Sequence, residues 1–579
     1  MTPPVLPGGH PAEADHPATV PAAVLRRAEE DPDRPALTDR HGTMTYGRLV
    51  TAARELAAVL RPRLTGAEPV VAVLQPRTSA APVAQFAAWL AGAAFLPLDP
   101  ALPAARIAQV LAEADCRLAV AADDLADRLP PELTVVRSRA TEPGGELLTP
   151  PDDPTRLAYL VSTSGSTGRP RQVEVEHGSL RAVLDWYGEF FRLGPGVRTA
   201  AFAGLAFDAS LLDLWAPLSH GATVLLADET VLREPERIVD VLRRADHAFL
   251  ATPLAEQLLR ADPPTGRLRS LATGGDRLRV WPPADFGAAV HNLYGPTEAT
   301  ILVTATDDLR RHVERTGPPP IGRPVAGARL SLAPVDGGDE LLVAGPLLAR
   351  GYRNAPESTA AVFRSTPGGR HYRTGDLCRS DGTGQLHFVG RSDGQVKIRG
   401  NRIELREVEF ALLAVPGVTQ AVADVLDRAG EAVLAAWVVG PVDADAVRAG
   451  LRERLPASMV PHLVEVRPEL PLTVNGKLDR RALRDSATDD VPTAPQAEDG
   501  SVASTVAAAW QAVLGRAAEP DDDFFGAGGD SLLAVRFSAE VRRGSGLDVR
   551  AALLYEHRRF ADYLRAVEAL DPDRMGATR

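Results

Sequence analysis

A cluster of small and hydroxyl-bearing residues is the first candidate for chemistry. The run Thr163-Ser164-Gly165-Ser166-Thr167-Gly168-Arg169-Pro170 follows an apolar stretch, residues 157–161, that we expect to be a strand. Small residues allow successive backbone N–H groups to turn toward one anion, and the hydroxyl groups add further donors. The Gly-Lys-Ser/Thr of a Walker loop does not occur in this run. The loop predicts phosphate binding, although Ser/Gly turns without a ligand are also common.

Ser531 is the second candidate. It lies in the run DDFFGAGGDSLL at residues 522–533, where a helical apolar spacing begins. A lone Gly-Asp-Ser would only cap that helix. With Phe524-Phe525 before the serine and Leu532-Leu533 after it, the run instead resembles the attachment site of a peptidyl carrier protein. That resemblance implies a covalent 4′-phosphopantetheine arm on Ser531 and a phosphopantetheinyl transferase as a partner.

Further motifs follow the loop in a fixed order. They are Tyr294-Gly295-Pro296-Thr297-Glu298, Tyr372-Arg373-Thr374-Gly375-Asp376-Leu377, the run GRSDGQVKIRG at residues 390–400, and Asn475-Gly476-Lys477. Weaker matches lie at residues 90–99, 207–210 and 349–352. Together with the loop, these motifs resemble the adenylation domains of nonribosomal peptide synthetases, within the adenylate-forming enzyme superfamily. The resemblance covers roughly residues 20–485.

The resemblance implies a site for ATP and Mg²⁺. The candidate nucleotide-binding residues are Thr163, Ser164, Gly165, Ser166, Thr167, Gly168, Arg171, Tyr294, Thr297, Glu298, Asp376 and Arg391. Glu298 is the expected magnesium ligand, because this hard cation favours carboxylate and phosphate oxygens. Tyr294 is expected beside the adenine, Asp376 as acceptor for both ribose hydroxyls, and Arg391 on the ribose or phosphate side.

The chain departs from the family pattern at one position of the loop. The family continues with Pro-Lys-Gly, whereas this chain has Pro170-Arg171-Gln172. Arg171 keeps a positive charge but replaces a compact ammonium by a planar guanidinium. Two alternatives therefore remain: a slower enzyme, or a loop held in a different conformation.

Asp208 indicates the substrate class. It matches the family aspartate that pairs with the α-ammonium of an amino acid, and an aspartate in an apolar segment needs such a partner. A helix cap or a satisfied core carboxylate are the alternatives. The residues matching the side-chain pocket are Ala209, Leu212, Leu250, Ala272, Gly274, Leu293, Ile301 and Leu302. None is polar, so we expect a neutral apolar amino acid: valine, leucine, isoleucine or proline, with an aromatic as the alternative.

The resemblance also supplies catalytic roles. Lys477 is expected to reach the substrate carboxylate and the bridging phosphate oxygen. Asp393 matches the hinge about which the small domain rotates after adenylation, and Lys397 lies on the face that the rotation brings in. Asp393 as a plain turn residue is the alternative.

Composition restricts the function classes. Hydrophobic residues make up 45% of the chain and charged residues 24%, with a net charge of −12. Those values are typical of a globular protein and argue against nucleic acid as a partner. The two cysteines give no disulfide framework, which suits a cytoplasmic location. We recognise no signal peptide, and the most apolar stretch, residues 84–98, is too short to span a membrane, so we expect a buried helix followed by a strand.

The elements that position these residues are expected in several domains. Helical stretches alternate with short apolar strands, which predicts an α/β core with parallel sheets, a small mobile α+β subdomain and an all-α four-helix carrier bundle. The expected boundaries are a leader at 1–20, the adenylation core at 21–391, its C-terminal subdomain at 392–485, an acidic linker at 486–502, the carrier domain at 503–570 and a tail at 571–579.

The expected function is ATP-dependent activation of an amino acid as aminoacyl-AMP, followed by loading of the chain's own carrier thiol. We recognise no condensation or esterase motif, so transfer to a downstream condensation or tailoring enzyme in trans is expected. An MbtH-like helper protein is a further candidate partner. A ligase for non-amino acids that loads a carrier, and a carrier or docking protein with weakened catalysis, are the alternatives.

Overall fold

The computed structural model describes most of the chain. The described residues are 5–7, 18–138, 152–165, 169–232, 234–261, 266–312, 315, 317–381, 383–392, 395–398, 400–428, 431–471, 478–489, 501–514, 517–525, 527, 529 and 531–570. They divide into two compact units. The first contains Met1–Asp228 and Val239–Glu407, and the second contains Glu229–Ile238 and Val408–Arg579.

A seven-stranded sheet carries the candidate phosphate loop. Its order is β19 (Gly351–Tyr352), β9 (Arg171–Glu176), β8 (Leu157–Thr163), β5 (Ala94–Leu98), β4 (Val70–Leu74), β6 (Leu118–Ala121) and β7 (Thr134–Arg137). The strands from β8 to β7 are parallel, whereas β9 is antiparallel to β8 and β19 is antiparallel to β9. Because β4 and β5 are buried along their whole length, they are continuous apolar runs.

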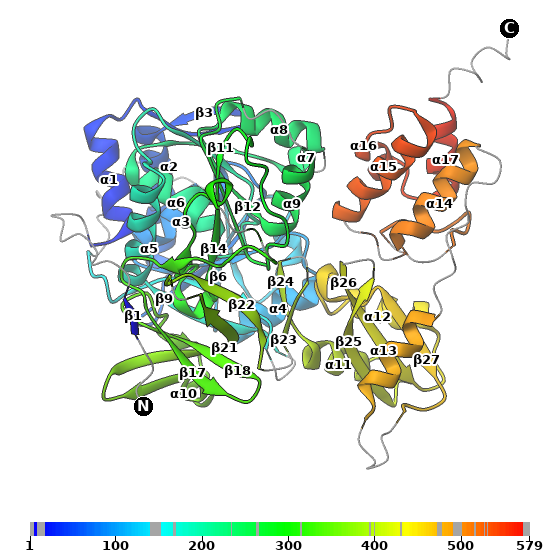
Figure 1. Cartoon of the computed structure of the whole chain (residues 1–579). Helices are drawn as coiled ribbons and strands as arrows, with labels where there is room; N and C mark the ends of the chain where they lie inside the picture. The colour runs from blue at the N-terminus through cyan, green and yellow to red at the C-terminus, as the bar shows by residue number, and fades with distance from the viewer. Residues whose placement is uncertain are drawn as a thin grey trace, which may run out of the picture. The chain divides into compact units, whose positions relative to one another are not determined.

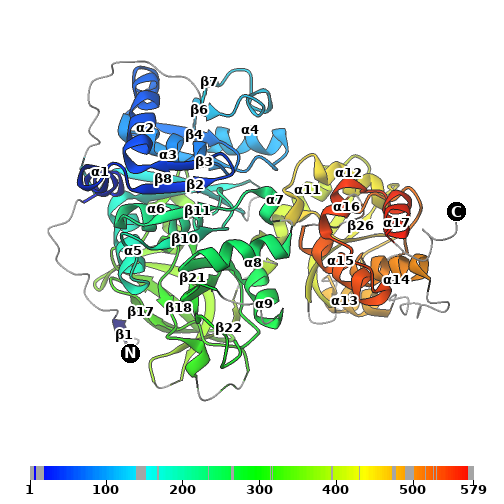
Figure 2. The same ribbon diagram turned by 90° about the horizontal axis from the view of Figure 1, so that it is seen from above.

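The apolar stretch at residues 84–98 forms a buried helix and strand, as expected. Helix α3 (Ala80–Ala91) leads into β5 through Gly92, whose φ of +90° is a conformation that favours glycine. Helix α2 (Tyr46–Leu60) lies beside α3 in Figure 2, and α4 (Ala104–Glu113) follows β5. Among the described residues, no helix has the length and apolar character needed to cross a membrane.

A nine-stranded sheet carries the candidate substrate residues. Its order is β16 (Arg323–Pro324), β15 (Thr304–Ala305), β14 (Ala289–Tyr294), β13 (Ser270–Gly274), β12 (His247–Ala251), β10 (Arg198–Ala201), β11 (Thr223–Leu226), β2 (Pro35–Asp39) and β3 (Gly42–Thr45). The strands from β14 to β2 are parallel, so their carboxyl ends lie at one edge. The chain leaves this edge toward Asp208, Asp276 and Glu298.

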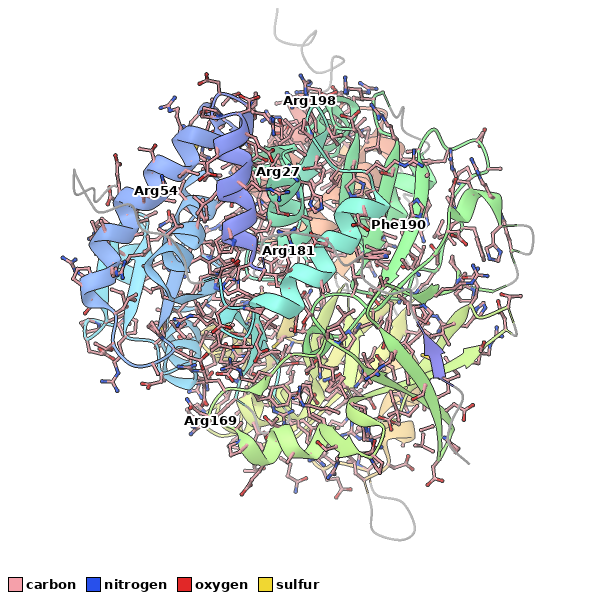
Figure 3. All side chains as sticks on the ribbon, turned by 90° about the vertical axis from the view of Figure 1, so that its left-hand side faces the viewer. Arg27, Arg54, Arg169, Arg181, Phe190 and Arg198 are labelled. Atoms are coloured by element: carbon pink, nitrogen blue, oxygen red, sulfur yellow. The ribbon has the colours of Figure 1, made fainter. Side chains whose placement is uncertain are left out.

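Helices from both sheets meet in one hydrophobic core. Trp89 of α3 packs against Trp215 of α6 (Ser210–His220), with ring centroids 4.6 Å apart. Each indole N–H has an acceptor: Trp89 donates to the Ala158 carbonyl at 2.7 Å and Trp215 to Gln85 Oε1 at 2.8 Å. Helices α1 (Val20–Glu30) and α5 (His177–Phe190) pack against the same core. Figure 3 views α1, α2 and α5 from outside, with Arg27, Arg54 and Arg181 labelled.

An antiparallel sheet completes the first unit. It contains β1 (Val5–Pro7), β17 (Arg329–Val335), β18 (Gly338–Ala344), β21 (Gly369–Ser380) and β20 (Phe363–Thr366), with β22 (Leu386–Arg391) paired to β21. Strands β17, β18 and β21 lie together in Figure 1, near α10 (Pro356–Val362). A separate hairpin joins β23 (Gln395–Ile398) to β24 (Asn401–Glu404).

The second unit contains a small sheet of β25 (Gln420–Arg428), β26 (Glu431–Val439) and β27 (Leu463–Arg467). Helices α12 (Ala444–Arg452) and α13 (Arg480–Asp489) accompany it. Helix α13 continues to Asp489, into residues expected to be linker, because Leu483 and Ala487 pack on Trp437 of the sheet. Two helices contain residues of both units: α8 (Pro235–Arg244) and α11 (Leu405–Leu413). The short helix α7 (Glu229–Leu232) lies within the second unit. Helix α9 (Thr252–Ala261) belongs to the first unit.

The expected carrier is a helical bundle in the second unit. Its helices are α14 (Val502–Leu514), α15 (Ser531–Ser545), α16 (Ala551–Glu556) and α17 (Phe560–Glu568). Trp510, Phe524, Phe537 and Tyr563 form its aromatic centre. Aromatic side chains of this size bury large apolar areas, which a small domain needs for a stable core.

Candidate active site

The candidate phosphate loop leaves β8 and returns along β9. Thr163 pairs with Arg171 across these antiparallel strands. A Cβ atom at Gly165 would lie 1.9 Å from the Arg169 carbonyl oxygen, so only glycine fits this turn. Arg169 is exposed, as Figure 3 shows, and pairs with Glu113 at 3.3 Å. Ser164 and Gly165 belong to the described part of the loop, whereas Ser166, Thr167 and Gly168 lie outside the described residues.

Arg171, the departure from the family pattern, lies over the ring of Tyr352. Its guanidinium carbon lies 5.3 Å from the centroid of the Tyr352 ring. A guanidinium over an aromatic face is held by the ring quadrupole. The replacement of lysine by arginine therefore retains a positive charge beside Tyr352, with a planar group that a lysine would not stack in the same way.

Glu298 lies fully buried in a short 3-10 helix, η3 (Thr297–Ala299), that follows β14. Its Oε1 accepts a hydrogen bond from the Tyr352 hydroxyl at 2.7 Å. Arg402 Nη1 lies 2.9 and 2.8 Å from its two oxygens. Burial by itself raises the pKa of Glu298, but the Arg402 charge and the Tyr352 hydrogen bond outweigh that effect and hold the pKa below its usual value.

This carboxylate suits the expected Mg²⁺. It is an ionised oxygen donor that already neutralises one cationic group, Arg402. The described residues contain no group of three or more side chains able to hold a metal. Magnesium bound through one carboxylate takes its other ligands from water and substrate phosphates. Glu298 would therefore hold the ion, and the ion would neutralise phosphate charge.

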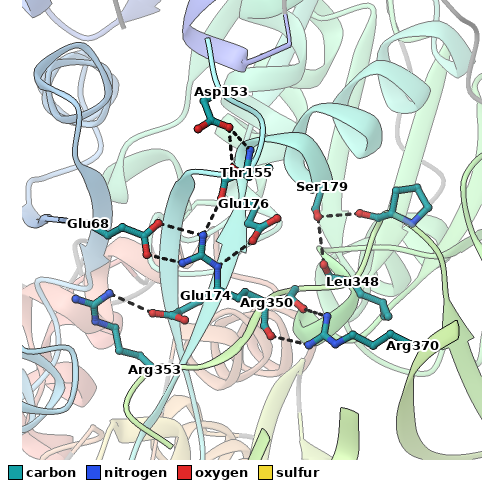
Figure 4. Close-up of polar contacts among 12 residues, drawn as sticks. Glu68, Asp153, Thr155, Glu174, Glu176, Ser179, Leu348, Arg350, Arg353 and Arg370 are labelled. Atoms are coloured by element: carbon teal, nitrogen blue, oxygen red, sulfur yellow. Dashed lines mark hydrogen bonds and ion pairs between the residues drawn. The ribbon is translucent and has the colours of Figure 1, made fainter. Parts of the chain in front are cut away.

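Arg350 and Arg353, which precede and follow β19, form ion pairs with glutamates that include two of β9 (Figure 4). Arg350 Nε lies 2.8 Å from Glu176 Oε1, and its Nη2 lies 3.0 Å from Glu68 Oε1. Arg353 Nη1 pairs with Glu174 Oε1 at 3.1 Å. These charges fix β19 to β9 on either side of Tyr352. The sequence signalled this segment only as a weak motif match at residues 349–352.

The candidate ribose site is an antiparallel strand pair. Asp376 of β21 is opposite Arg391 of β22, and their side chains form an ion pair. The Tyr294 hydroxyl donates a hydrogen bond to the other oxygen of the Asp376 carboxylate. Asp376 is only 2% exposed, and Arg391 Nη2 also donates to the Thr374 carbonyl at 3.1 Å. The structure thus brings Tyr294, Asp376 and Arg391 into direct contact.

Asp208 lies between β10 and α6, at the carboxyl edge of the nine-stranded sheet. Burial raises its pKa, while a hydrogen bond from the Thr297 side chain and the Ala209 backbone N–H oppose that rise. Thr297 precedes Glu298 in η3. The residue expected to bind the amino group therefore lies next to the segment expected to bind magnesium. Lys397 also acts on Asp208 electrostatically and lies 5.7 Å from the Tyr294 ring centroid.

Two buried side chains hold the backbone that leads to Asp208. Asp213 Oδ2 accepts hydrogen bonds from the N–H groups of Phe202 and Ala203, at 2.9 and 2.8 Å. Arg77 donates to the carbonyls of Ala201 and Ala227, at 3.0 and 2.8 Å, and also to that of Ala203. Burial raises the pKa of Asp213 to about 7. The sequence analysis did not identify Arg77 or Asp213. The only signal in the sequence is that Asp213 is a second aspartate, five positions after Asp208.

The strand register places most, but not all, of the expected pocket residues together. Gly274 pairs with Leu293, and Ala272 lies two residues earlier on the same face. Leu250 pairs with Thr273, on the opposite face. The core cluster that includes Leu212, Ala272, Leu293, Ile301 and Leu302 also includes Phe249, and Ala209 packs against it. Phe249, which sequence reasoning missed, is therefore the β12 residue on the Ala272 face.

The turn before Ile301 is strained. Thr300 and Ile301 have φ values of 54° and 71°, which β-branched residues rarely adopt. A Cβ atom at Gly295 would lie 2.3 Å from the Leu302 Cα, so the turn also needs glycine there. Such strain costs on the order of 1–3 kcal/mol per residue and is retained where the surroundings enforce it.

Three further residues were expected to take part in catalysis or carrier loading: Asp393, Lys477 and Ser531. Asp393 and Lys477 lie outside the described residues. Ser531 is the first residue of α15. Just before it, a Cβ atom at Gly529 would lie 2.2 Å from the Phe524 ring, so glycine is required for the close approach.

Comparison with known proteins identifies the same three parts. The AMP-binding enzyme family matches residues 24–353, the AMP-binding enzyme C-terminal domain matches residues 407–477, and the phosphopantetheine attachment site matches residues 504–567. These matches confirm ATP, Mg²⁺ and covalent 4′-phosphopantetheine as the groups that proteins of this class use.

Curated relatives are synthetases larger than this chain. A linear gramicidin synthase protein of Brevibacillus parabrevis is 37% identical over 95% of this chain, which covers 11% of that protein. Phosphinothricin tripeptide synthetase PhsC of Streptomyces viridochromogenes is 37% identical over 96% of this chain, which covers 53% of the relative. The chain thus spans about a tenth of the first relative and about half of the second.

A solved structure covers the same extent as this chain. It is that of holo-PA1221, a synthetase protein containing adenylation and PCP domains, bound to a vinylsulfonamide inhibitor. The identity is 30%, the TM-score 0.79, and the match covers 96% of this chain and 98% of that one. The expected fold is confirmed. The chain belongs to the AMP-binding enzyme family, as a nonribosomal peptide synthetase adenylation domain, of the amino-acid-adenylating ligase class, followed by a peptidyl carrier domain.

Proposed function

We propose that this chain activates a neutral, apolar amino acid with ATP and transfers it to its own carrier domain. The observation that carries the proposal is the position of Asp208 beside the Thr297 side chain, whose interaction with the carboxylate opposes the rise in pKa that burial causes. This position links a partly buried carboxylate, suited to an ammonium group, to the segment that carries Glu298. An amino acid held by Asp208 would place its carboxylate toward the nucleotide residues.

The first step is attack of the substrate carboxylate on the α-phosphorus of ATP, with release of pyrophosphate. The protein positions the groups and neutralises charge rather than reacting covalently. Asp376, Arg391 and Tyr294 would hold the nucleoside, and the loop at 163–168 the phosphates. Lys477 would approach the carboxylate and Asp393 would act as the hinge, as the family pattern suggests.

The second step is transfer of the aminoacyl group to the carrier. The phosphopantetheine arm on Ser531 supplies the accepting thiol, and AMP leaves. The acidic linker between α13 and α14 would keep the carrier at a high local concentration. A phosphopantetheinyl transferase is required for the arm. A downstream condensation or tailoring enzyme in trans, and an MbtH-like helper, are the further proposed partners.

The apolar character of the side chains expected to line the substrate pocket supports the proposed substrate class. Leu212, Ala272, Leu293, Ile301 and Leu302 share one hydrophobic cluster. A charged or strongly hydrogen-bonding side chain would lose its partners there, at a cost of about 1–3 kcal/mol per group. Valine, leucine, isoleucine or proline fit this lining best, and an aromatic amino acid is the second candidate.

Amino-acid-dependent ATP–pyrophosphate exchange tests the first step. A panel of amino acids and simple carboxylic acids, with and without a helper protein, should show exchange with apolar amino acids. Stimulation by non-amino acids alone would contradict the role of Asp208. Intact mass after phosphopantetheinylation tests the second step: Ser531→Ala should lose loading yet keep exchange, while Lys477→Ala should lose exchange. No loading with any amino acid would favour a carrier with weakened catalysis.

A further inference from the structure

The phosphate loop contacts a carboxylate of the chain itself. The backbone N–H of Gly165 donates a hydrogen bond to Glu407 Oε2 at 3.0 Å. Glu407 lies in the first turn of α11 and is only 1% exposed. The loop's N–H is thus used by an internal anion, at a position where the proposed function requires a phosphate oxygen.

Arg106 fixes this carboxylate. Its Nη2 lies 2.6 Å from Glu407 Oε1, and the two side chains are 6% and 0% exposed. Arg106 also donates to Gln109 Oε1 at 2.9 Å, within α4. A buried, charge-assisted pair of this kind is stronger than an exposed one. Glu407 is therefore held at the loop from a second side, by a group that is not part of the proposed nucleotide site.

The segment before Glu407 makes further contacts in the same place. Ser164, the loop residue next to Gly165, donates its hydroxyl hydrogen to the Arg402 carbonyl at 3.0 Å. Arg402 in turn pairs with Glu298. The Gly400 N–H donates to Asp276 Oδ2 at 3.0 Å. Residues 400–407 thus contact three groups of the candidate site: the Ser164 hydroxyl, the Gly165 N–H and the Glu298 carboxylate.

We propose that Glu407, clamped by Arg106, is an internal competitor of pyrophosphate for the phosphate loop. The inference rests on the proposed function, in which the loop binds the phosphates of ATP. One N–H cannot donate fully to Glu407 and to a phosphate at once, so docking of Glu407 and binding of pyrophosphate exclude each other at Gly165. Docking after pyrophosphate has left opposes its return, and so opposes reversal of adenylation.

Titration with inorganic pyrophosphate and Mg²⁺ tests the proposal directly. If the docked arrangement is populated, the apparent affinity is lowered by the fraction of molecules that are competent to bind. Glu407→Gln weakens the docked state and should bind pyrophosphate about three- to tenfold more tightly than the unmodified protein, by calorimetry. Arg106→Gln should act in the same direction, and the double variant should not add the two effects. Glu29→Gln, an exposed glutamate of α1, is the matched control.

Unchanged or weaker pyrophosphate binding in Glu407→Gln would overturn the proposal. If that variant does not fold, as judged by circular dichroism, Arg106→Gln decides by the same criterion. Exchange assays on the unmodified protein keep the two proposals apart. Absence of amino-acid-dependent exchange contradicts the proposed function, whereas intact exchange with pyrophosphate binding equal in all variants contradicts the role of Glu407 alone.

Discussion

Arg402 and Glu298 form an ion pair in which one guanidinium nitrogen lies within 2.9 Å of both carboxylate oxygens. Glu298 is the residue proposed to hold magnesium, so a side chain of the protein supplies the positive charge that the ion would otherwise supply. Two consequences can be measured: how far the stability of the protein depends on this ion pair, and how far Mg²⁺ changes that stability.

Removal of Arg402 should destabilise the fold, because the Glu298 carboxylate would stay buried without a charged partner. Arg402→Met should lower the free energy of unfolding by about 3–5 kcal/mol, because one member of a buried pair is left without compensation. Millimolar Mg²⁺ should restore part of this loss in thermal melts. The double variant Arg402→Met/Glu298→Gln should be less destabilised than the single one and should not respond to Mg²⁺. Equal magnesium responses in both variants would contradict the assignment of Glu298.

The hydroxyl of Tyr294 should matter for ATP rather than for the amino acid. Tyr294→Phe removes the hydrogen bond to Asp376, worth about 1.5–3 kcal/mol for a charged acceptor. We expect KM for ATP to rise about tenfold while KM for the amino acid stays unchanged. Tyr46→Phe is the control, since its buried hydroxyl donates to carbonyls of Leu218 and Ala222, away from the site. A similar rise in both variants would indicate a general loss of packing.

Asp213 should make stability depend on pH. Its pKa is raised from 3.8 to about 7 in the folded protein, so the folded state binds a proton that the unfolded state has lost between these values. Protonation of Asp213 therefore adds to the free energy of unfolding below about pH 4. This contribution, roughly 4 kcal/mol at most, is lost as the pH rises to about 7. The melting temperature of the unmodified protein, relative to Asp213→Asn, should therefore fall between about pH 4 and pH 7. A difference that does not change with pH would contradict this.

The pocket can be tested with a matched pair of leucines. Leu293→Ala removes side-chain volume on the face shared with Gly274, and should shift the preference in exchange assays from valine toward aromatic amino acids by about tenfold or more. Leu250→Ala makes the same chemical change on the opposite face. It should lower stability by about 2–5 kcal/mol without changing the preference. A shift of preference in Leu250→Ala would place that residue in the pocket after all.

The sequence alone determined the family, because ordered motifs such as Tyr294–Glu298 and the Ser531 run depend on local spacing. It also predicted strands such as β4 and β11, since both are short apolar runs between helical stretches. Phe249 was missed because alternation along β12 does not say which face meets Ala272; the register with β13 decided that.

Only the tertiary structure revealed the contacts of Arg402, Glu407 and Arg106. Arg402 lies 104 residues from Glu298 in the chain, and Glu407 lies 242 residues from Gly165. From the sequence, a single charged residue is expected to be exposed, because burial of a charge is favourable only when a partner is present. The partners come from distant segments, so the pairing that makes these charges functional candidates exists only in the folded chain.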